Sequence, residues 1–94
     1  MPITAESVFQ RSPSATHQTV AGEAIVIDLD TGSYYSLNET GTWLWENLDG
    51  RRNVEQLAQE LAAVCDIPDQ AATVQTDLVE LLGNLLQEKL VLAV

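Results

Sequence analysis

Basic side chains are scarce in this sequence. Its 94 residues include four Lys and Arg against 14 Asp and Glu, which gives a formal net charge of −10. Affinity for nucleic acid depends largely on Lys and Arg that displace counterions from the phosphate backbone. The composition therefore argues against a nucleic-acid partner. It suits a partner with basic residues, whose approach a negative field accelerates, although solubility is the simpler reason for most individual charges.

Cysteine and histidine are nearly absent. With a single Cys65 and a single His17, the chain can form no internal disulfide and offers no Cys/His cluster with metal-ligand spacing. A lone thiol agrees with a reducing compartment. Because Cys65 falls at an apolar position of a helical pattern, we expect a buried structural thiol. Nothing near Cys65 or His17 supports a catalytic pair.

Other marks of an enzyme are also missing. The sequence has no glycine-rich phosphate loop and no Ser/His/Asp set, and abundant carboxylates alone do not define a reaction. We therefore expect no catalytic residue, no metal and no cofactor. No apolar run approaches the ~20 residues that span a bilayer. The N-terminus also lacks the pattern of a signal peptide, so we expect a soluble cytoplasmic protein without a membrane partner.

The chain length predicts one folded domain. Ninety-four residues bury roughly 65% of the surface that the unfolded chain exposes, which is enough for one core. Residues 1–15 contain two prolines and little periodicity, and we expect a flexible N-terminal arm there. Residues 16–94 then form the domain.

The next segment has the pattern of a β-hairpin. Alternating apolar residues over 24–29 predict a strand, and a first strand is expected near residues 16–20. Asp30-Thr31-Gly32 is typical of a type I turn followed by a left-handed glycine, which leads into a strand over residues 33–37. That last strand has no Lys and no Pro, the residues that usually protect an exposed sheet edge. If its outer edge is free, it can accept an extended peptide.

Three helices are predicted after the hairpin. Asn38 suits the cap of the first helix, with Gly50 as its stop. Asn53 and Gln56 have the spacing of a capping box at the second. The third is expected from about Pro68 to Glu88. Residues 90–94 form an apolar tail that packs back on the body.

The third helix is unusually apolar. Its Val and Leu residues fill an arc of roughly 160°, whereas a surface helix needs only about 100° to anchor itself to a core. The C-terminal tail or a second copy of the chain, in a homodimer, would cover the excess. Alternatively, one flank lines a groove beside the strand at 33–37, with Asp77 and Glu80 near an acidic rim.

This order of elements predicts an α+β fold of the winged helix-turn-helix type, with a three-stranded antiparallel sheet followed by three helices. In that fold the helix after the break usually reads DNA, and a transcriptional regulator is therefore the alternative function. Here that helix carries Asp69, Asp77, Glu80 and Glu88, with only Lys89 to balance them. A carrier protein is a third option, but Thr76-Asp77-Leu78 lacks the serine that would hold a phosphopantetheine arm.

Several segments follow one another in an order known from a protein family. They are the strand pair 24–29 and 33–37, Leu37-Asn38-Glu39-Thr40-Gly41 before Leu44-Trp45, then Leu48-Asp49-Gly50, then Val54, Leu57, Ala58 and Leu61, then Asp77-Leu78 with Leu81, Leu82 and Leu85, and finally Leu90-Val91. Over about residues 16–92 the chain resembles the PqqD-like proteins, also called RiPP recognition elements. The Leu-Asn-Glu-Thr-Gly form is most similar to stand-alone members of lasso-peptide clusters, and members that serve radical-SAM maturases are the other option. Many members have Gly where this chain has Lys89.

The resemblance implies a binding module without chemistry of its own. Such proteins hold the leader segment of a ribosomally made precursor peptide and present the core to a modifying enzyme, such as a leader peptidase, a cyclase or a radical-SAM maturase. The leader is taken as a β-strand beside the strand at 33–37, with its apolar side chains against the third helix. By this resemblance, the expected peptide-binding residues are Ser33, Tyr34, Tyr35, Ser36, Leu37, Val74, Asp77, Leu78, Leu81 and Leu82.

Overall fold

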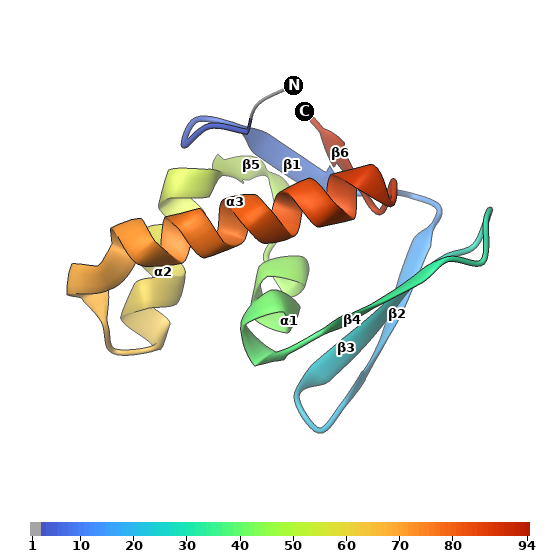
Figure 1. Cartoon of the computed structure of the whole chain (residues 1–94), viewed down its shortest axis with the longest axis horizontal. Helices are drawn as coiled ribbons and strands as arrows, with labels where there is room; N and C mark the ends of the chain where they lie inside the picture. The colour runs from blue at the N-terminus through green and yellow to red at the C-terminus, as the bar shows by residue number, and fades with distance from the viewer. Residues whose placement is uncertain (1–2) are drawn as a thin grey trace.

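The computed structural model describes residues 3–94, which form an α+β fold with two three-stranded antiparallel sheets and three α-helices (Figure 1). No helix in this part of the chain is both long enough and apolar enough to cross a membrane. In chain order the elements are β1 (Val8–Arg11), β2 (Ala15–Val20), β3 (Glu23–Asp28), β4 (Tyr34–Leu37), α1 (Glu39–Glu46), β5 (Asp49–Asn53), α2 (Val54–Val64), the short 3-10 helix η1 (Pro68–Gln70), α3 (Ala71–Gln87) and β6 (Val91–Ala93).

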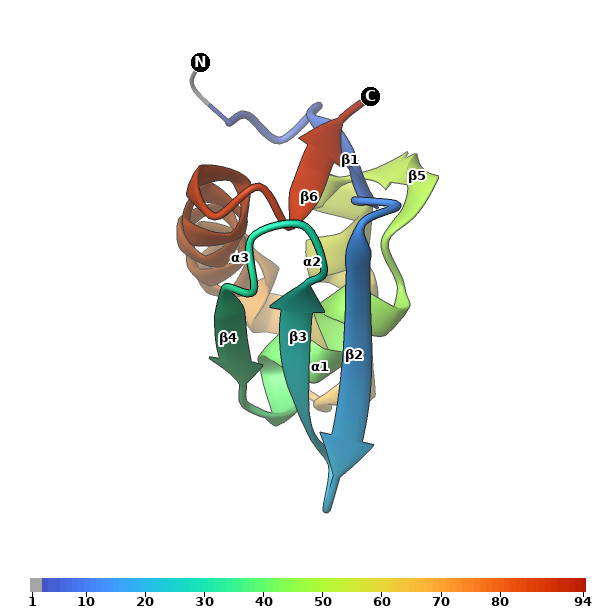
Figure 2. The ribbon, with the colours of Figure 1, turned by 90° about the vertical axis from the view of Figure 1, so that its right-hand side faces the viewer.

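The two sheets are separate. One has the strand order β2-β3-β4, and the other has the order β5-β1-β6. Figure 2 shows the first sheet face-on, with β4 at its outer edge on the side where α3 lies, and the second sheet beyond its end. The predicted hairpin is present: β3 and β4 pair antiparallel with Val26 opposite Tyr35. In the turn between them Gly32 adopts a φ of +77°, and its N–H donates to the Asp28 carbonyl at 2.8 Å.

The second sheet differs from the prediction of three strands followed by three helices. β1 lies inside the segment expected to be a flexible arm, where it pairs with β5 and β6 and buries Phe9. Residues 1–2 of that expected arm lie outside the described residues. β5 has the polar sequence Asp-Gly-Arg-Arg-Asn, which gives no alternating apolar signal. These strands form because distant segments pair, and single-segment patterns do not report such pairing.

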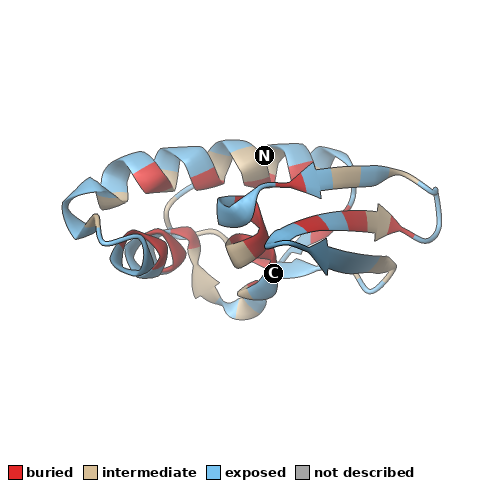
Figure 3. Ribbon diagram, turned by 90° about the horizontal axis from the view of Figure 1, so that it is seen from below, coloured by how far each residue is buried: buried red, intermediate tan, exposed pale blue. Residues whose placement is uncertain are grey.

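The core is a single cluster of apolar side chains between the helices and the inner faces of the sheets. Figure 3 shows buried residues on the sides of the elements that face one another. Cys65 is exposed, so the prediction of a buried thiol is wrong. It is the C-cap residue of α2, one position beyond Val64, which is itself exposed. The fully buried large side chains include Trp45, Leu44, Leu57, Leu78, Leu82, Leu85, Leu90, Val26, Val54 and Val91.

The predicted starts of the first two helices are confirmed, whereas the third α-helix starts at Ala71, after the 3-10 helix at Pro68–Gln70. The Asn38 side chain accepts a hydrogen bond from the Gly41 N–H at 2.9 Å, and Asn53 and Gln56 form a reciprocal capping box. The end of α1 is not where the sequence placed it. The helix stops at Glu46, and Gly50 lies within β5 at a φ of +75°. A glycine is needed there because the chain turns through a left-handed conformation.

The other two helices end in Schellman motifs without glycine. After α3, the Lys89 N–H donates to the Leu86 carbonyl at 3.0 Å and the Leu90 N–H donates to the Leu85 carbonyl at 2.9 Å. Lys89 has a φ of +61°, the left-handed conformation that this motif requires. Asp66 occupies the equivalent position after α2, with a φ of +60°. Lys89, which stands where the resemblance leads us to expect glycine, therefore adopts a left-handed conformation that is strained for a residue with a side chain.

Replacing Lys89 with glycine should stabilise the protein. Removing the side chain relieves left-handed strain of about 1–2 kcal/mol, and the greater freedom of the unfolded chain offsets part of that gain. We expect K89G to raise the free energy of unfolding by about 0.5–1 kcal/mol in urea titrations. E88G is the matched control, because Glu88 has an ordinary φ of −83°, and it should lower stability. A K89G variant no more stable than the parent would contradict this interpretation.

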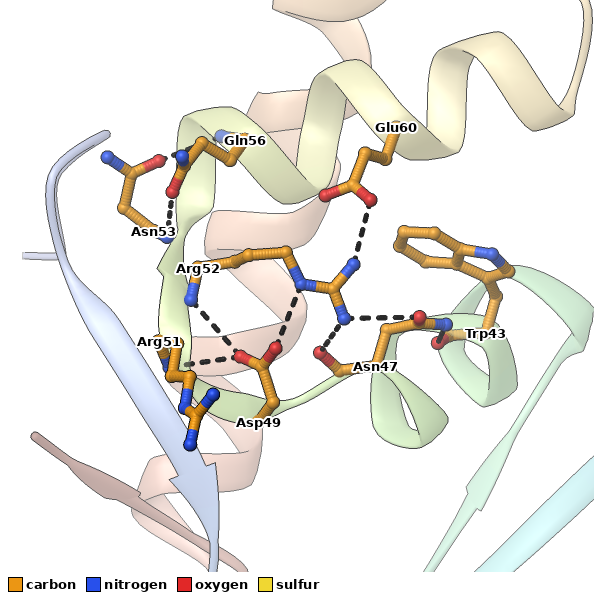
Figure 4. A network of polar contacts seen from close by, with 8 residues as sticks. All are labelled: Trp43, Asn47, Asp49, Arg51, Arg52, Asn53, Gln56 and Glu60. Atoms are coloured by element: carbon orange, nitrogen blue, oxygen red, sulfur yellow. Dashed lines mark hydrogen bonds and ion pairs between the residues drawn. The ribbon is translucent and has the colours of Figure 1, made fainter.

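Arg52 of β5 joins its own strand to α2 and to the end of α1 (Figure 4). Its guanidinium pairs with Asp49 at 3.1 Å and with Glu60 of α2 at 2.8 Å, and it donates to the Asn47 carbonyl after α1 at 2.9 Å. Asp49 also accepts hydrogen bonds from the N–H groups of Arg52 and Arg51. Chiefly these two backbone hydrogen bonds lower the pKa of Asp49 from 3.8 to about 2. The network fixes the turn from α1 into β5.

The lowered pKa of Asp49 predicts a pH dependence of stability. The folded pKa lies below the unfolded value, so the stabilisation is complete above pH 3.8 and is lost as the pH falls toward about 2. D49N should lower stability near neutral pH and lose less stability over that acid range than the parent. Urea titrations at several pH values measure both effects. D69N, which changes an exposed carboxylate outside the network, should follow the parent, and identical acid profiles for D49N and the parent would refute the assignment.

Candidate functional site

Among the described residues β4 is an edge strand, with β3 on one side and no strand on its other, outer side. In an antiparallel ladder, hydrogen-bonded residue pairs alternate with non-bonded pairs. The Asp28 N–H donates to the Ser33 carbonyl at 2.8 Å, and this bond sets the alternation for the pairs that follow. The main-chain groups of Ser33, Tyr35 and Leu37 therefore face β3, and those of Tyr34 and Ser36 face outward. Within residues 3–94 no strand pairs with this outer side.

A groove of about 410 Å³ runs between β4, the start of α1 and the middle of α3. Its walls combine an open strand edge with apolar side chains and one carboxylate. A concave site that combines apolar side chains with polar groups is typical of ligand binding. The residues that line it are Tyr35, Ser36, Leu37, Asn38, Thr40, Gly41, Asp77, Leu78 and Leu81.

Contacts between neighbouring elements hold the two walls in place. The Ala24 N–H donates to the buried Thr42 hydroxyl at 2.8 Å, which fixes α1 against β3. At the other end, the Asn84 side chain of α3 donates to the Tyr35 hydroxyl at 3.3 Å. The first contact positions α1 against the sheet, and the second joins α3 to β4.

Gly41 sets the width of the groove. A Cβ built at this position would meet Leu37 Cδ2 at 3.1 Å and Leu81 Cδ2 at 3.3 Å, closer than ordinary van der Waals contact. Leu37 and Leu81 lie on opposite walls. The missing side chain therefore lets helix α1 approach both walls without filling the space between them.

The structure brings together six of the ten residues expected from the sequence: Tyr35, Ser36, Leu37, Asp77, Leu78 and Leu81. Tyr34 precedes them on β4 and does not line the groove, and 72% of its surface is exposed. Ser33 lies before the strand and is half-buried. Val74 and Leu82 are not among the residues that line the groove, and both belong to the core.

The two flanks of the wide apolar arc of α3 have different neighbours. Leu81 contributes to the groove, whereas Leu86 lines a separate cavity of about 120 Å³ with Phe9 and residues of β6 and the C-terminus. The C-terminal segment thus covers one flank, as one of the expectations proposed, and the other flank borders the groove. The buried side of the helix fills the core.

Sequence reasoning did not include Asn38, Thr40 and Gly41 among the binding residues. All three belong to the Leu-Asn-Glu-Thr-Gly run, in which Asn38 was interpreted only as a helix cap. A glycine inside the first turn of a helix was the available signal, since glycine often marks a close approach of the backbone to another group. Within residues 3–94 no cluster of three or more His, Cys, Asp or Glu side chains could hold a metal ion.

A family model described as coenzyme PQQ synthesis protein D (PqqD) matches residues 23–91, which is more than half of the chain. The chain belongs to the PqqD family. The matched segment begins at β3 and ends in β6, and it includes every residue that lines the groove.

Among solved structures, this PqqD-family chain is similar to "TbiB1 in Complex with the TbiA(beta) Leader Peptide". The TM-score is 0.75 at 23% sequence identity, and the match covers 87% of this chain and 93% of that chain. At this level of identity the likeness establishes the fold. No curated protein shows significant similarity to the chain.

The role of Gly41 can be tested with two Gly→Ala substitutions in helices. G41A should lower the free energy of unfolding by about 1–2 kcal/mol, because the clash with Leu37 and Leu81 exceeds the gain in helix propensity. G83A is the matched control. Its Cβ would meet only Ile3, at 4.0 Å, and it should raise stability by about 0.5–1 kcal/mol. Urea titrations compare the two, and equal gains in stability would show that the groove has room for a side chain at Gly41.

Proposed function

We propose that this PqqD-family protein binds the leader segment of a ribosomally synthesised precursor peptide and presents it to a modifying enzyme. The leader adds as a strand to the outer edge of β4. The observation that carries this proposal is the open edge beside the groove. The solved structure with the same fold is described as a complex with a leader peptide, which supports the same function here.

The groove suits an extended peptide in particular. Tyr34 and Ser36 each direct one N–H and one C=O outward, so a visiting strand can form up to four main-chain hydrogen bonds with these two residues. Alternate side chains of that strand would point toward Leu78 and Leu81. Main-chain bonds of this kind give affinity, and the groove wall gives selectivity for side chains.

The expected affinity is moderate. Each hydrogen bond contributes about 1 kcal/mol net, and each buried apolar anchor contributes about 1.5–3 kcal/mol. After the cost of ordering the peptide, a Kd in the micromolar to high-nanomolar range is reasonable. Reversible binding of this strength suits a protein that raises the local concentration of a substrate at an enzyme.

We assign the protein no catalysis of its own and a cytoplasmic location. We further propose that it serves a lasso-peptide system, with a leader peptidase or a cyclase as partner. The fold is interpreted as a winged helix-turn-helix in which β3 and β4 form the wing. A DNA-binding regulator gains no support, because α3 contains no Lys or Arg between Ala71 and Gln87. Retardation of duplex DNA at low salt would favour that function instead.

Removing one outward N–H tests the strand addition. S36P deletes an N–H on the open side of β4 without removing a hydrogen bond to β3. The proline ring also occupies space that a peptide strand needs when it pairs with β4. We expect the Kd for the precursor peptide to rise at least tenfold, as measured by calorimetry, which corresponds to about 1.4 kcal/mol.

T19P is the matched control for that experiment. Thr19 faces outward on β2, the opposite edge of the same sheet, so T19P should bind the precursor within twofold of the parent. Circular dichroism and urea titrations check that both variants fold. Equal affinities for S36P and the parent, or an equal loss in T19P, would rule out addition at β4.

A further inference from the structure

The groove is electrostatically one-sided. β4, α1 and α3 supply its walls together with Asn38, which lies between β4 and α1, and none of these elements contains Lys or Arg. The basic residues lie elsewhere: Arg11 on β1, Arg51 and Arg52 on β5, and Lys89 after α3. The carboxylates on the same three elements are Glu39, Glu46, Asp77 and Glu80.

Asp77 is the carboxylate that lines the groove itself. It is exposed, and both ion pairs formed within residues 3–94 belong to Arg52. Asp77 therefore has no cationic partner in the described part of the chain. A cation delivered by a bound peptide would meet an uncompensated negative charge at the groove wall.

The spacing of the groove wall matches the repeat of a strand. Asp77 and Leu81 are four helical residues apart, which is about 6 Å along the axis of α3. Alternate residues of a strand, which point to the same side, are about 6.6 Å apart. Asn84 of α3 contacts Tyr35 of β4. Leu81, about one turn earlier in α3, lies close to Gly41 of α1. α3 therefore runs alongside β4 and the start of α1. Two inward-facing side chains of one strand can therefore reach Leu81 and Asp77 together.

We propose that the groove selects an extended peptide with a Lys or Arg residue that pairs with Asp77. The cationic residue lies two positions from an apolar residue that contacts Leu81 beside Gly41. This inference rests on the proposed strand addition and adds the chemical class of the peptide. The net charge of −10 acts in the same direction, because it attracts cationic peptides before contact and does so less at high salt.

The test uses a displayed library of random twelve-residue peptides, selected in parallel on the immobilised parent protein, on D77N and on E55Q. Glu55 is an exposed carboxylate on α2, outside the groove, so E55Q is the matched control. Peptides that bind the groove are identified by their weaker binding to S36P. In this set we expect enrichment of Lys or Arg two positions from an apolar residue, in the selections on the parent and on E55Q.

Individual peptides give the quantitative result. A peptide selected on the parent should bind D77N about three- to fivefold more weakly, the size expected for one exposed ion pair, and should bind E55Q with unchanged affinity. Groove-binding peptides without Lys or Arg enrichment, or with equal affinity for D77N, would overturn the proposed selectivity and leave strand addition intact. If no selected peptide is weakened by S36P, both the selectivity and the proposed function fail.

Discussion

The main-chain N–H and C=O groups of a protein need hydrogen-bond partners. Within residues 3–94 no strand provides such partners to the outer side of β4. Water satisfies these groups in the free protein, and an extended peptide can replace that water. The edge stays open because the chain leaves the sheet at once. Asn38 caps α1 directly after Leu37, and Thr42 fixes that helix against β3. In the described part of the chain, no later strand pairs with this side of β4.

The same constraint explains the shape of the groove. α1 turns beneath the sheet close to β4, and Gly41 permits this approach because it has no side chain to clash with Leu37 and Leu81. α3 then passes on the open side of β4, where Asn84 holds it through Tyr35. The Arg52 network fixes the turn from α1 into β5. The groove is thus a consequence of how three elements pack.

Local patterns in the sequence were sufficient for much of this architecture. The turn at residues 30–32 and the helix caps at Asn38 and Asn53 depend only on contacts between residues close together in the sequence. The structure confirms all three. The strands β1, β5 and β6 were not predicted as one sheet, because they depend on pairing between distant segments. A short polar strand such as β5 carries no periodic signal of its own.

The candidate site was predictable to a similar extent. The open strand and the apolar flank of α3 follow from residue types, so Ser36 and Leu81 were identified in advance. A helical wheel, however, does not show which side of a wide apolar arc faces the core, and Val74 and Leu82 proved to be core residues. Asn38, Thr40 and Gly41 were missed because their part in the groove depends on the approach of α1 to α3.

Amide hydrogen exchange at single residues of β4 tests the central claim most directly. In the free protein, the outward N–H groups of Tyr34 and Ser36 should exchange faster than those of Tyr35 and Leu37, which face β3. Addition of the precursor peptide should slow exchange at Tyr34 and Ser36. Slow exchange at both residues in the free protein, or no change when the peptide binds, would contradict this account.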